Sequence, residues 1–283
     1  MALSQLSTLL DDARKQQRAV SALSVANLEM IQGVVHAAEE TNTPVILQIA
    51  EVRLHTAPLH IIGPAMIAAA KASSVDIAVH LDHGLTEGCI EQAMEIGFTS
   101  VMYDGSHLPL AQNIENTQRL VQRAHALGVD VEAEVGRIGQ TEDNRKSPIA
   151  YADPVEALRF LRETDVDALA VGIGNAHGVY EGAPDLHFDI LRDISAASDV
   201  PLVLHGGTGI AADDFRHAIR LGVRKINIAT ALFQAAAEGA EGGGSIFDIS
   251  QRMIDKTCAM AMHHMRIFGL AGKECLCKAS PSI

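Results

Sequence analysis

Short apolar runs alternate with amphipathic stretches along almost the whole chain, and this alternation limits the fold more than any other feature of the sequence. Such a pattern is typical of repeated βα units and a parallel sheet. Strands are predicted over residues 19–25, 44–50, 76–81, 100–103, 129–135, 168–173, 201–205 and 225–228. Helices are predicted over residues 27–40, 58–72, 87–96, 109–127, 154–163, 188–197 and 213–221. Eight such units fit a (β/α)8 TIM barrel better than a doubly wound sheet, which usually contains fewer strands.

The chain shows no internal division. No low-complexity linker interrupts its 283 residues, so the sequence predicts a single barrel domain over residues 1–283. Residues 238–245 contain four glycines and predict a flexible loop after the eighth strand. A C-terminal helical extension is expected over about residues 246–272. Residues 139–150 are polar and lack an apolar period, which indicates a mobile loop.

The overall charge disfavours two classes of partner. A net charge of -13 and a pI near 5.4 disfavour nucleic acid and anionic membrane surfaces. The first 20 residues carry charges among their apolar positions, unlike a signal peptide, and no run approaches the roughly 18 apolar residues of a membrane span. The four cysteines are interpreted as reduced thiols. The predicted compartment is the cytoplasm.

A carboxylate and an imidazole stand side by side where the third predicted strand ends. Asp82 and His83 lie in the stretch Val79–Gly84, which follows an apolar run and precedes a predicted helix. Neutral imidazole is a common zinc ligand, and an adjacent acid can move protons without occupying the metal. A lone pair of this kind more often caps the next helix, so it needs support from elsewhere in the chain.

Further candidate ligands follow other predicted strands, and a barrel gathers the carboxyl ends of its strands on one face. The residues at such ends are Asp82, His83, Asp104, Glu134, His177 and His205. Three histidines with nearby carboxylates predict a zinc site that keeps a position open for substrate.

Two turns after the last two predicted strands favour phosphate binding. Residues 205–209 read His-Gly-Gly-Thr-Gly, and residues 227–230 read Asn-Ile-Ala-Thr. Each turn leads into a helix, where backbone amides are available to an anion, and barrels tend to bind phosphate after strands seven and eight. The glycines of either turn taken alone would equally well serve only to make the turn tight.

Several motifs together resemble those of a known family. Residues 79–84, 100–107, 131–136, 170–178, 201–207 and 225–230 are similar, in order and spacing, to the motifs of the class II, zinc-dependent ketose-bisphosphate aldolases. The fructose- and tagatose-bisphosphate branch is the most similar. The resemblance extends over about residues 10–272 and is specific for the family, but much less so for the sugar.

The resemblance implies a role for each matching position. The catalytic zinc would be held by His83, His177 and His205. Asp82 would exchange a proton with the C4 hydroxyl, and Glu142 would move the proton on C3 of dihydroxyacetone phosphate. Asp104 and Glu134 match positions that support the metal or bind a second divalent ion, and a monovalent cation, Na+ or K+, often accompanies the phosphate site. The dihydroxyacetone phosphate end would be bound by Gly178, Gly206, Gly207, Thr208, Asn227, Ile228, Ala229 and Thr230.

The chain departs from the family pattern on the acceptor side. Leu23 and Ser24 replace a Phe-Asn pair, which removes an amide that commonly reaches into the site. After the second strand, Glu51 would repel a second phosphate, whereas Arg53 could grip a phosphate or a carboxylate. Gln140 stands where a glycine is usual and would stiffen the loop that follows.

Two further residues carry expectations. A zinc mechanism requires no Schiff-base lysine, and Lys225 alternates with Ile226 and Ile228 on the last predicted strand, so we expect Lys225 to point away from the site. His80 either supports a metal ligand or packs through a hydrogen bond.

The resulting expectation is an aldehyde-lyase that cleaves a ketose 1,6-bisphosphate of fructose or tagatose type to dihydroxyacetone phosphate and an aldehyde such as glyceraldehyde 3-phosphate. The nearest alternative is a same-family aldolase for a ketose 1-phosphate or for a phosphorylated keto-sugar acid, and Arg53 would allow the acid. A metal-dependent hydrolase is an alternative of another class. A non-catalytic homologue is disfavoured by the complete set of site residues. The methionine-rich C-terminal helix suggests a homodimer or homotetramer, although packing on the barrel would explain it equally.

Overall fold

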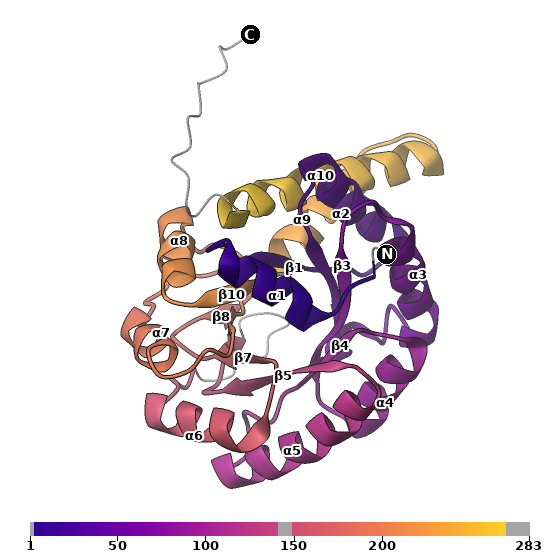
Figure 1. The fold of residues 1–283 in the computed structure, drawn as a ribbon. Coiled ribbons are helices and arrows are strands. Elements are labelled where there is room, and N and C mark those ends of the chain that lie inside the picture. The colour runs from indigo at the N-terminus through magenta and orange to yellow at the C-terminus, as the bar shows by residue number, and fades with distance from the viewer. Residues whose placement is uncertain (1–2, 141–148, 270–283) are drawn as a thin grey trace.

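The computed structural model describes residues 3–140 and 149–269, and in that part of the chain eight parallel strands close into a barrel (Figure 1). The order around the barrel is β1, β10, β9, β7, β5, β4, β3 and β2, so the last strand pairs with the first. The strands are β1 Val20–Ser24, β2 Val45–Ala50, β3 Ile77–Gly84, β4 Ser100–Tyr103, β5 Asp130–Val135, β7 Ala168–Val171, β9 Leu202–Leu204 and β10 Val223–Ile228. The predicted (β/α)8 fold is confirmed.

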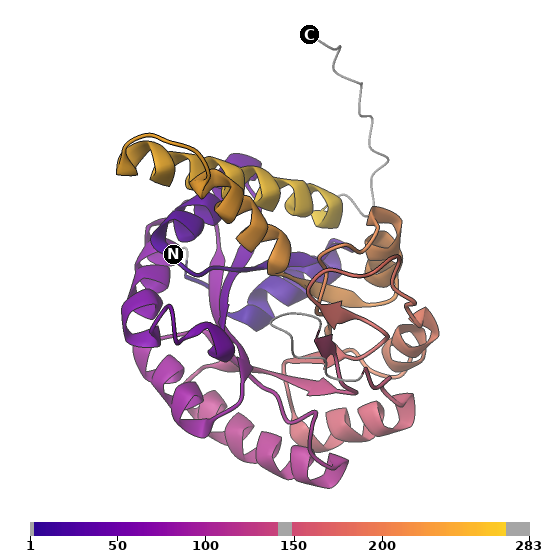
Figure 2. The same cartoon turned by 180° about the vertical axis from the view of Figure 1, so that it is seen from behind.

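A ring of helices surrounds the barrel (Figures 1 and 2). The helices that follow the strands are α2 Leu28–Thr41, α3 Leu59–Ala72, α4 Glu87–Ile96, α5 Leu110–Ala126, α6 Pro154–Thr164, α7 Phe188–Ser195, α8 Ala212–Arg220 and α9 Thr230–Ala240. Their boundaries agree with the sequence prediction to within one or two residues where a range was predicted. Side-chain caps explain where two of these helices begin. Asn27 accepts the amide of Met30 at the start of α2, and Asp153 accepts the amide of Val155 at the start of α6, whose first residue is a proline.

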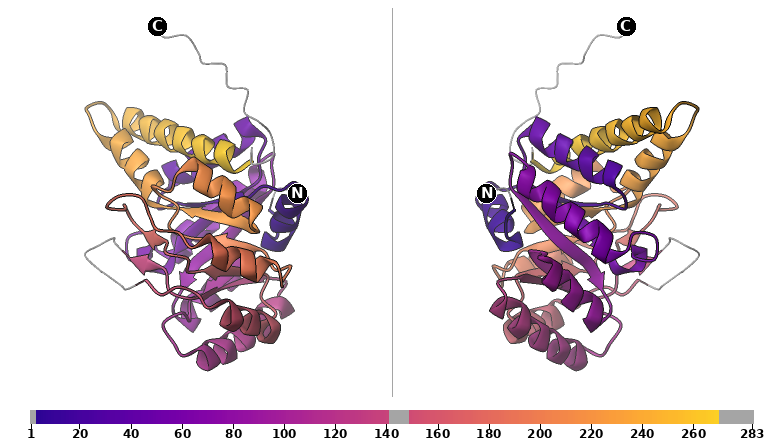
Figure 3. Two further views of the ribbon diagram at one scale, coloured as in Figure 1. Left: turned by 90° about the vertical axis from the view of Figure 1, so that its left-hand side faces the viewer. Right: turned by 90° about the vertical axis from the view of Figure 1, so that its right-hand side faces the viewer.

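A helix that the sequence analysis did not predict covers one end of the barrel. Helix α1, Leu6–Lys15, buries four apolar residues, and these belong to one cluster with strand residues such as Ala22, Ala78 and Val203. Figure 3 shows α1 at the end opposite to the turn between α9 and α10. Ser7 of α1 bonds Asp130, the first residue of β5, so α1 covers the amino ends of the strands and leaves their carboxyl ends for the site.

The C-terminal helix α10, Ile246–Gly269, lies against α2 and α9 (Figure 2). Gly33 of α2 permits the close approach, since a Cβ there would lie 2.7 Å from the Ile254 carbonyl oxygen. The predicted extension is thus confirmed to Gly269, and residues 270–272 lie outside the described chain. The loop predicted over residues 238–245 begins too early, because α9 continues to Ala240.

Short elements at the mouth of the barrel were also not predicted. Strand β6, Gly139–Gln140, pairs in parallel with β8, Ala176–His177, so the start of the predicted loop 139–150 is extended backbone. A 3-10 helix, η1 Glu51–Arg53, follows β2. Within the described residues, none of the helices has both the length and the apolar composition needed to cross a membrane.

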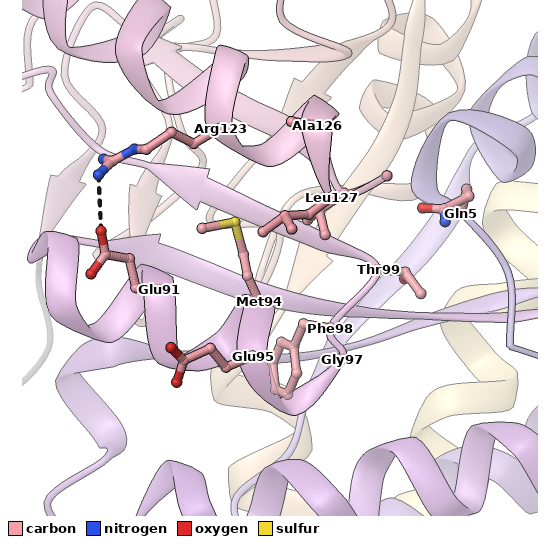
Figure 4. A pocket seen from close by; sticks show the side chains of 12 residues that line it. Gln5, Glu91, Met94, Glu95, Gly97, Phe98, Thr99, Arg123, Ala126 and Leu127 are labelled. Carbon is pink, nitrogen blue, oxygen red and sulfur yellow. Dashed lines mark hydrogen bonds and ion pairs between the residues drawn. The ribbon is translucent and has the colours of Figure 1, made fainter.

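A hollow between α4 and α5 lies away from these elements (Figure 4). Gly97 and Gly128 line it just before β4 and β5 begin, which places it toward the amino ends of those strands. Its lining includes Met94, Phe98 and Leu127. Because barrel enzymes place their chemistry at the carboxyl ends of the strands, this hollow is distinct from the candidate site.

Candidate functional site

Asp82 and His83 both reach the site because the backbone turns between them. Residues next to each other on a strand normally point to opposite faces. His83 has φ +42, and the pairing of β3 with β4 shifts register between Leu81 and Gly84. A positive φ is uncommon outside glycine and is often found at functional sites. The irregular end of β3 thus presents the carboxylate and the imidazole together.

Three imidazoles converge at this point. His83 Nε2 lies 3.2 Å from His177 Nε2 and 2.9 Å from His205 Nδ1. Among residues 3–140 and 149–269, these three side chains form one of two groups that lie close enough together to share a metal ion. Zinc bound tetrahedrally by nitrogen at 2.0–2.1 Å requires nitrogen atoms about 3.3 Å apart. The donor set and its spacing therefore fit a zinc ion.

The second group consists of His83, Asp104 and Glu134. His83 Nδ1 lies 2.8 Å from Asp104 Oδ2 and 3.9 Å from Glu134 Oε2. Glu134 Oε1 accepts the Ile138 amide, whereas Oε2 is buried with no hydrogen-bond partner among the described residues. An orphaned carboxylate oxygen beside a second carboxylate fits either a bound cation or support of His83.

Burial and neighbouring charges shift the pKa values of the three histidines in opposite directions. Burial acts to lower the pKa of His83, but the charge of Asp82 and the hydrogen bond and charge of Asp104 outweigh it and raise the pKa to about 10. Burial and the charge of His83 lower the pKa of His177 to about 4 and that of His205 well below its usual value. Two imidazoles thus offer lone pairs at neutral pH, while His83 carries a proton that a metal would displace.

The carboxylates respond to the same neighbours. Burial and the charge of Asp104 raise the pKa of Glu134 to about 8. Burial would raise the pKa of Asp104 as well, but the hydrogen bond and charge of His83 lower it overall. Asp104 is therefore the ionised partner of His83 in the metal-free protein.

Asp82 is 5% exposed and is held by two side-chain amides. Gln48 Nε2 donates to Asp82 Oδ2 at 3.2 Å, and Asn227 Nδ2 donates to Oδ1 at 3.1 Å. Gln48 also donates to the Ser24 hydroxyl at 3.1 Å, so Ser24 is buried behind this contact. The sequence analysis did not single out Gln48, although its place two residues before the end of β2 was a usable signal.

The two predicted anion-binding turns lie beside each other. Gly207 donates its amide to the Asn227 carbonyl, and Thr208 Oγ1 accepts the Ala231 amide in the first turn of α9. Gly206 has φ +64, and a Cβ there would overlap the Ala176 carbonyl oxygen, so only glycine fits. Gly178 also has a positive φ, of +100, directly after His177. Thr230 begins α9 after Ile228 and Ala229.

One hydroxyl joins the segments that carry two of the histidines. Tyr180 accepts the Ala176 amide at 2.9 Å and donates to the Gly206 carbonyl at 2.8 Å. Asn175 donates to the His205 carbonyl at 3.0 Å and accepts the Ile173 amide. These contacts fix the backbones next to His177 and His205 relative to each other.

We expect Tyr180→Phe to lower the free energy of unfolding by about 1–3 kcal/mol, because a buried amide and a buried carbonyl lose their partner. Denaturant unfolding of the metal-free protein measures the change. The exposed Tyr151, changed to Phe, is the matched control and should unfold like the wild type. Equal stability of both variants would contradict a stabilising role for the two hydrogen bonds of the Tyr180 hydroxyl.

Arg53 is a cation of the described chain that follows β2. Arg53, on η1, lies with its guanidinium carbon 5.6 Å from the centre of the Phe233 ring, and its charge contributes to the lowered pKa of His177. Glu51 does not stand free beside it: its carboxylate accepts the amides of Leu85 and Thr86 and the Thr86 hydroxyl. The start of α4 thus compensates the charge that was expected to repel a second phosphate.

The expectation for Lys225 is wrong. Residues two apart on a strand share a face, and Lys225 points into the barrel together with Asn227, where its Nζ lies 2.8 Å from Glu132 Oε2. His80 is buried and bonds Ser100 Oγ at 2.8 Å, in agreement with a packing role. Glu142 falls outside the described residues; Gln140, two residues before it, is in register with His177.

Comparisons with known proteins show which family the chain resembles. The family model "Fructose-bisphosphate aldolase class-II" matches residues 4–273. A Bacillus licheniformis protein named 6-phospho-5-dehydro-2-deoxy-D-gluconate aldolase is 37% identical over 96% of this chain and 97% of its own length. A Staphylococcus aureus fructose-bisphosphate aldolase is 38% identical over 81% of this chain and 82% of its own length.

A solved structure has a similar fold. The crystal structure of the YdjI aldolase from Escherichia coli K12 superimposes with a TM-score of 0.86 and 32% identity, covering 96% of this chain and 99% of that one. The fold, the order of the motifs and the relatives all indicate the same family. The chain belongs to the class II fructose-bisphosphate aldolase family and is an aldehyde-lyase.

Proposed function

We propose that this protein is a zinc-dependent aldolase that cleaves a ketose 1,6-bisphosphate of fructose or tagatose type to dihydroxyacetone phosphate and an aldehyde such as glyceraldehyde 3-phosphate. The observation that carries the proposal is the convergence of three imidazole nitrogens beside the buried carboxylate of Asp82. The family uses zinc for the same reaction type, and the donor set here matches that metal.

His83 and His177 would hold the ion through Nε2 and His205 through Nδ1, since these atoms face one another. Zinc bound there supplies positive charge that stabilises the negative charge left on the three-carbon fragment. Asp104 fixes His83 by accepting its Nδ1 proton. Asp104 and Glu134 would support this ligand or bind a second divalent ion.

Asp82 is the proposed acid/base on the acceptor side. As the C3–C4 bond breaks, its carboxylate takes the proton of the C4 hydroxyl, and it returns that proton to the aldehyde oxygen in the reverse reaction. Gln48 and Asn227 keep both of its oxygens oriented. Glu142 is proposed to deliver the proton to C3, as the family resemblance implies; it follows Gln140 by two residues, and Gln140 pairs with His177.

The phosphate of the three-carbon fragment is proposed to bind where the two turns meet. Gly178, Gly206 and Thr208 would offer backbone amides on one side, where Gly207 holds the turn through its own amide bond to the Asn227 carbonyl. The segment Asn227–Thr230 would offer the start of α9 on the other side. A helix start favours an anion through its free amides and its dipole. A monovalent cation, Na+ or K+, is proposed to share this phosphate site.

A second candidate substrate is a ketose 1-phosphate or a phosphorylated keto-sugar acid. Arg53, whose charge acts on His177, favours an anion at the far end of the substrate and so supports the keto-sugar acid, since a ketose 1-phosphate has no anionic group there. The guanidinium can donate two parallel hydrogen bonds to a carboxylate or to a phosphate. Of the two relatives above, one is named for a phosphorylated keto-sugar acid and the other for fructose bisphosphate.

A substrate panel tests these proposals. Ketose 1,6-bisphosphates, ketose 1-phosphates and a phosphorylated keto-sugar acid are each assayed, with and without a chelator, for release of dihydroxyacetone phosphate through a coupled dehydrogenase. Chelator-sensitive release from one substrate class is the expected result. Release of inorganic phosphate in place of dihydroxyacetone phosphate would favour the hydrolase alternative, and full activity after chelation would contradict the zinc mechanism.

Replacement of Arg53 separates the two ends of the substrate. We expect Arg53→Leu to lower kcat/KM about 10- to 100-fold for substrates with a second anionic group, since a charge-assisted hydrogen bond contributes about 1.5–3 kcal/mol. Substrates without that group should be affected little. Arg53→Lys is the matched control, which keeps the charge and loses the fork. Equal losses for all substrates would exclude a role in recognising the distal anion.

We also propose that residues 1–283 act as one barrel domain in a cytoplasmic homodimer or homotetramer. Ile246 and Phe247, at the start of α10, are 68% and 82% exposed, which favours a contact with another subunit at that turn. Light scattering on the purified protein measures the mass. A monomer at all concentrations would contradict the assembly.

A further inference from the structure

A buried ion pair lies inside the barrel close to the three imidazoles. Lys225 of β10 and Glu132 of β5 are both 0% exposed, and Lys225 Nζ lies 2.8 Å from Glu132 Oε2. Placing two charges in a protein interior costs free energy that their attraction offsets only with good geometry. A pair in such a position therefore calls for an explanation beyond stability.

The other oxygen of Glu132 contacts a proposed zinc ligand. Glu132 Oε1 lies 2.8 Å from His205 Nε2. A carboxylate can only accept here, so Nε2 carries the hydrogen and donates it. Asn227 Nδ2 is 3.2 Å from the same nitrogen, but it has its own acceptor in Asp82 Oδ1. The lone pair of His205 is then on Nδ1, the atom that lies 2.9 Å from His83 Nε2. The contact selects the tautomer of His205 that can bind a metal with the others.

Lys225 supplies the charge that balances Glu132. His80 Nε2 is 3.7 Å from Glu132 Oε2, but burial and the charge of Lys225 lower the pKa of His80 well below its usual value, so His80 is neutral. His80 is also occupied by Ser100, 2.8 Å from its Nδ1. Lys225 and His205 thus approach different oxygens of one carboxylate and define its orientation.

We propose that Lys225 is a positioning residue for metal binding, which acts on His205 through Glu132. The ammonium group holds one carboxylate oxygen, and the other oxygen is thereby aimed at the Nε2 hydrogen of His205. The inference rests on the proposed function, in that His205 must be a zinc ligand. It adds to that function a control of zinc affinity by a side chain that touches neither metal nor substrate.

The test compares zinc affinity in Lys225→Met, Glu132→Gln and the double variant, by competition with a chromophoric chelator. Loss of a group that orients a metal ligand typically weakens metal binding 10- to 100-fold. We expect about tenfold weaker binding for Lys225→Met and a loss in the same 10- to 100-fold range for Glu132→Gln. The double variant should bind no more weakly than Glu132→Gln, because Lys225 acts only through that residue.

Losses that multiply in the double variant, or wild-type affinity in Lys225→Met, would overturn the inference. Glu132→Gln leaves Lys225 unpaired; if that variant does not fold, the double variant, in which no charge is left unpaired, should bind zinc about 10- to 100-fold more weakly than the wild type, and a larger loss would overturn the inference. Arg224→Met is the matched control, since Arg224 lies beside Lys225 on β10 but bonds the carbonyls of Ile219 and Val223. Absence of zinc binding in the wild type would overturn the proposed function instead.

Discussion

Asp82→Ala will retain zinc and lose turnover by about 100- to 10,000-fold, the range that a positioned acid/base contributes. The carboxylate lies next to His83 in sequence, yet the three nitrogens that group around a metal position belong to His83, His177 and His205. Removal of Asp82 therefore leaves the donor set complete. Alanine is preferred to asparagine, because Gln48 and Asn227 both donate to Asp82 and a new amide nitrogen would oppose one of them.

The measurement pairs turnover of the best substrate with zinc content by atomic emission. Asp130→Asn is the matched control. Asp130 is likewise a strand aspartate, but it begins β5 and accepts the Ser7 amide at the opposite end of the barrel. That variant should turn over like the wild type. Wild-type turnover by Asp82→Ala would remove this residue from the mechanism, and loss of zinc together with activity would make it a ligand.

Sequence reasoning located the fold and the candidate site because both depend on local patterns. Apolar runs and helical periods are local, and the barrel rule then brings the strand ends together. Asp82, His83, His177 and His205 were found in this way. The structure places the three histidines within reach of one ion, as the rule requires.

Features that depend on backbone irregularity or on distant partners were not accessible. The left-handed turn at His83 has no signature in its residue type, since glycine is the usual choice there. Helix α1 covers the barrel through contacts with several strands, so its apolar face is explained only once they are in place. Lys225 was misplaced for another reason: period-two alternation was applied to its apolar neighbours and not to Asn227, with which it shares a face.

The raised pKa of His83 makes metal binding at the site dependent on pH. His83 lies between Asp82, Asp104 and Glu134, and their charges hold its pKa near 10 in the metal-free protein. Binding of a metal needs the lone pair that this proton occupies. The same carboxylates that attract a cation thus also attract the competing proton, and the balance between them shifts with pH.

His83→Ala will abolish tight zinc binding and with it turnover at every zinc concentration tested. His83 is the residue that the two groups of candidate ligands share, so its loss dismantles both. His264→Ala is the matched control, as His264 is a buried histidine on α10 that bonds the Met260 carbonyl away from the site. The control should keep zinc and activity. Stoichiometric, tight zinc in His83→Ala would contradict the assignment.

In the wild type, zinc uptake at pH 7 should release at least one proton, detected with an indicator in weakly buffered solution. The sign follows from the pKa near 10: below it His83 is protonated, zinc must displace that proton, and affinity rises as pH increases. The rise should level off as pH approaches 10, where His83 is already neutral. Proton release that is absent at pH 7, or affinity that falls between pH 7 and 9, would exclude His83 as the residue at which proton and metal compete.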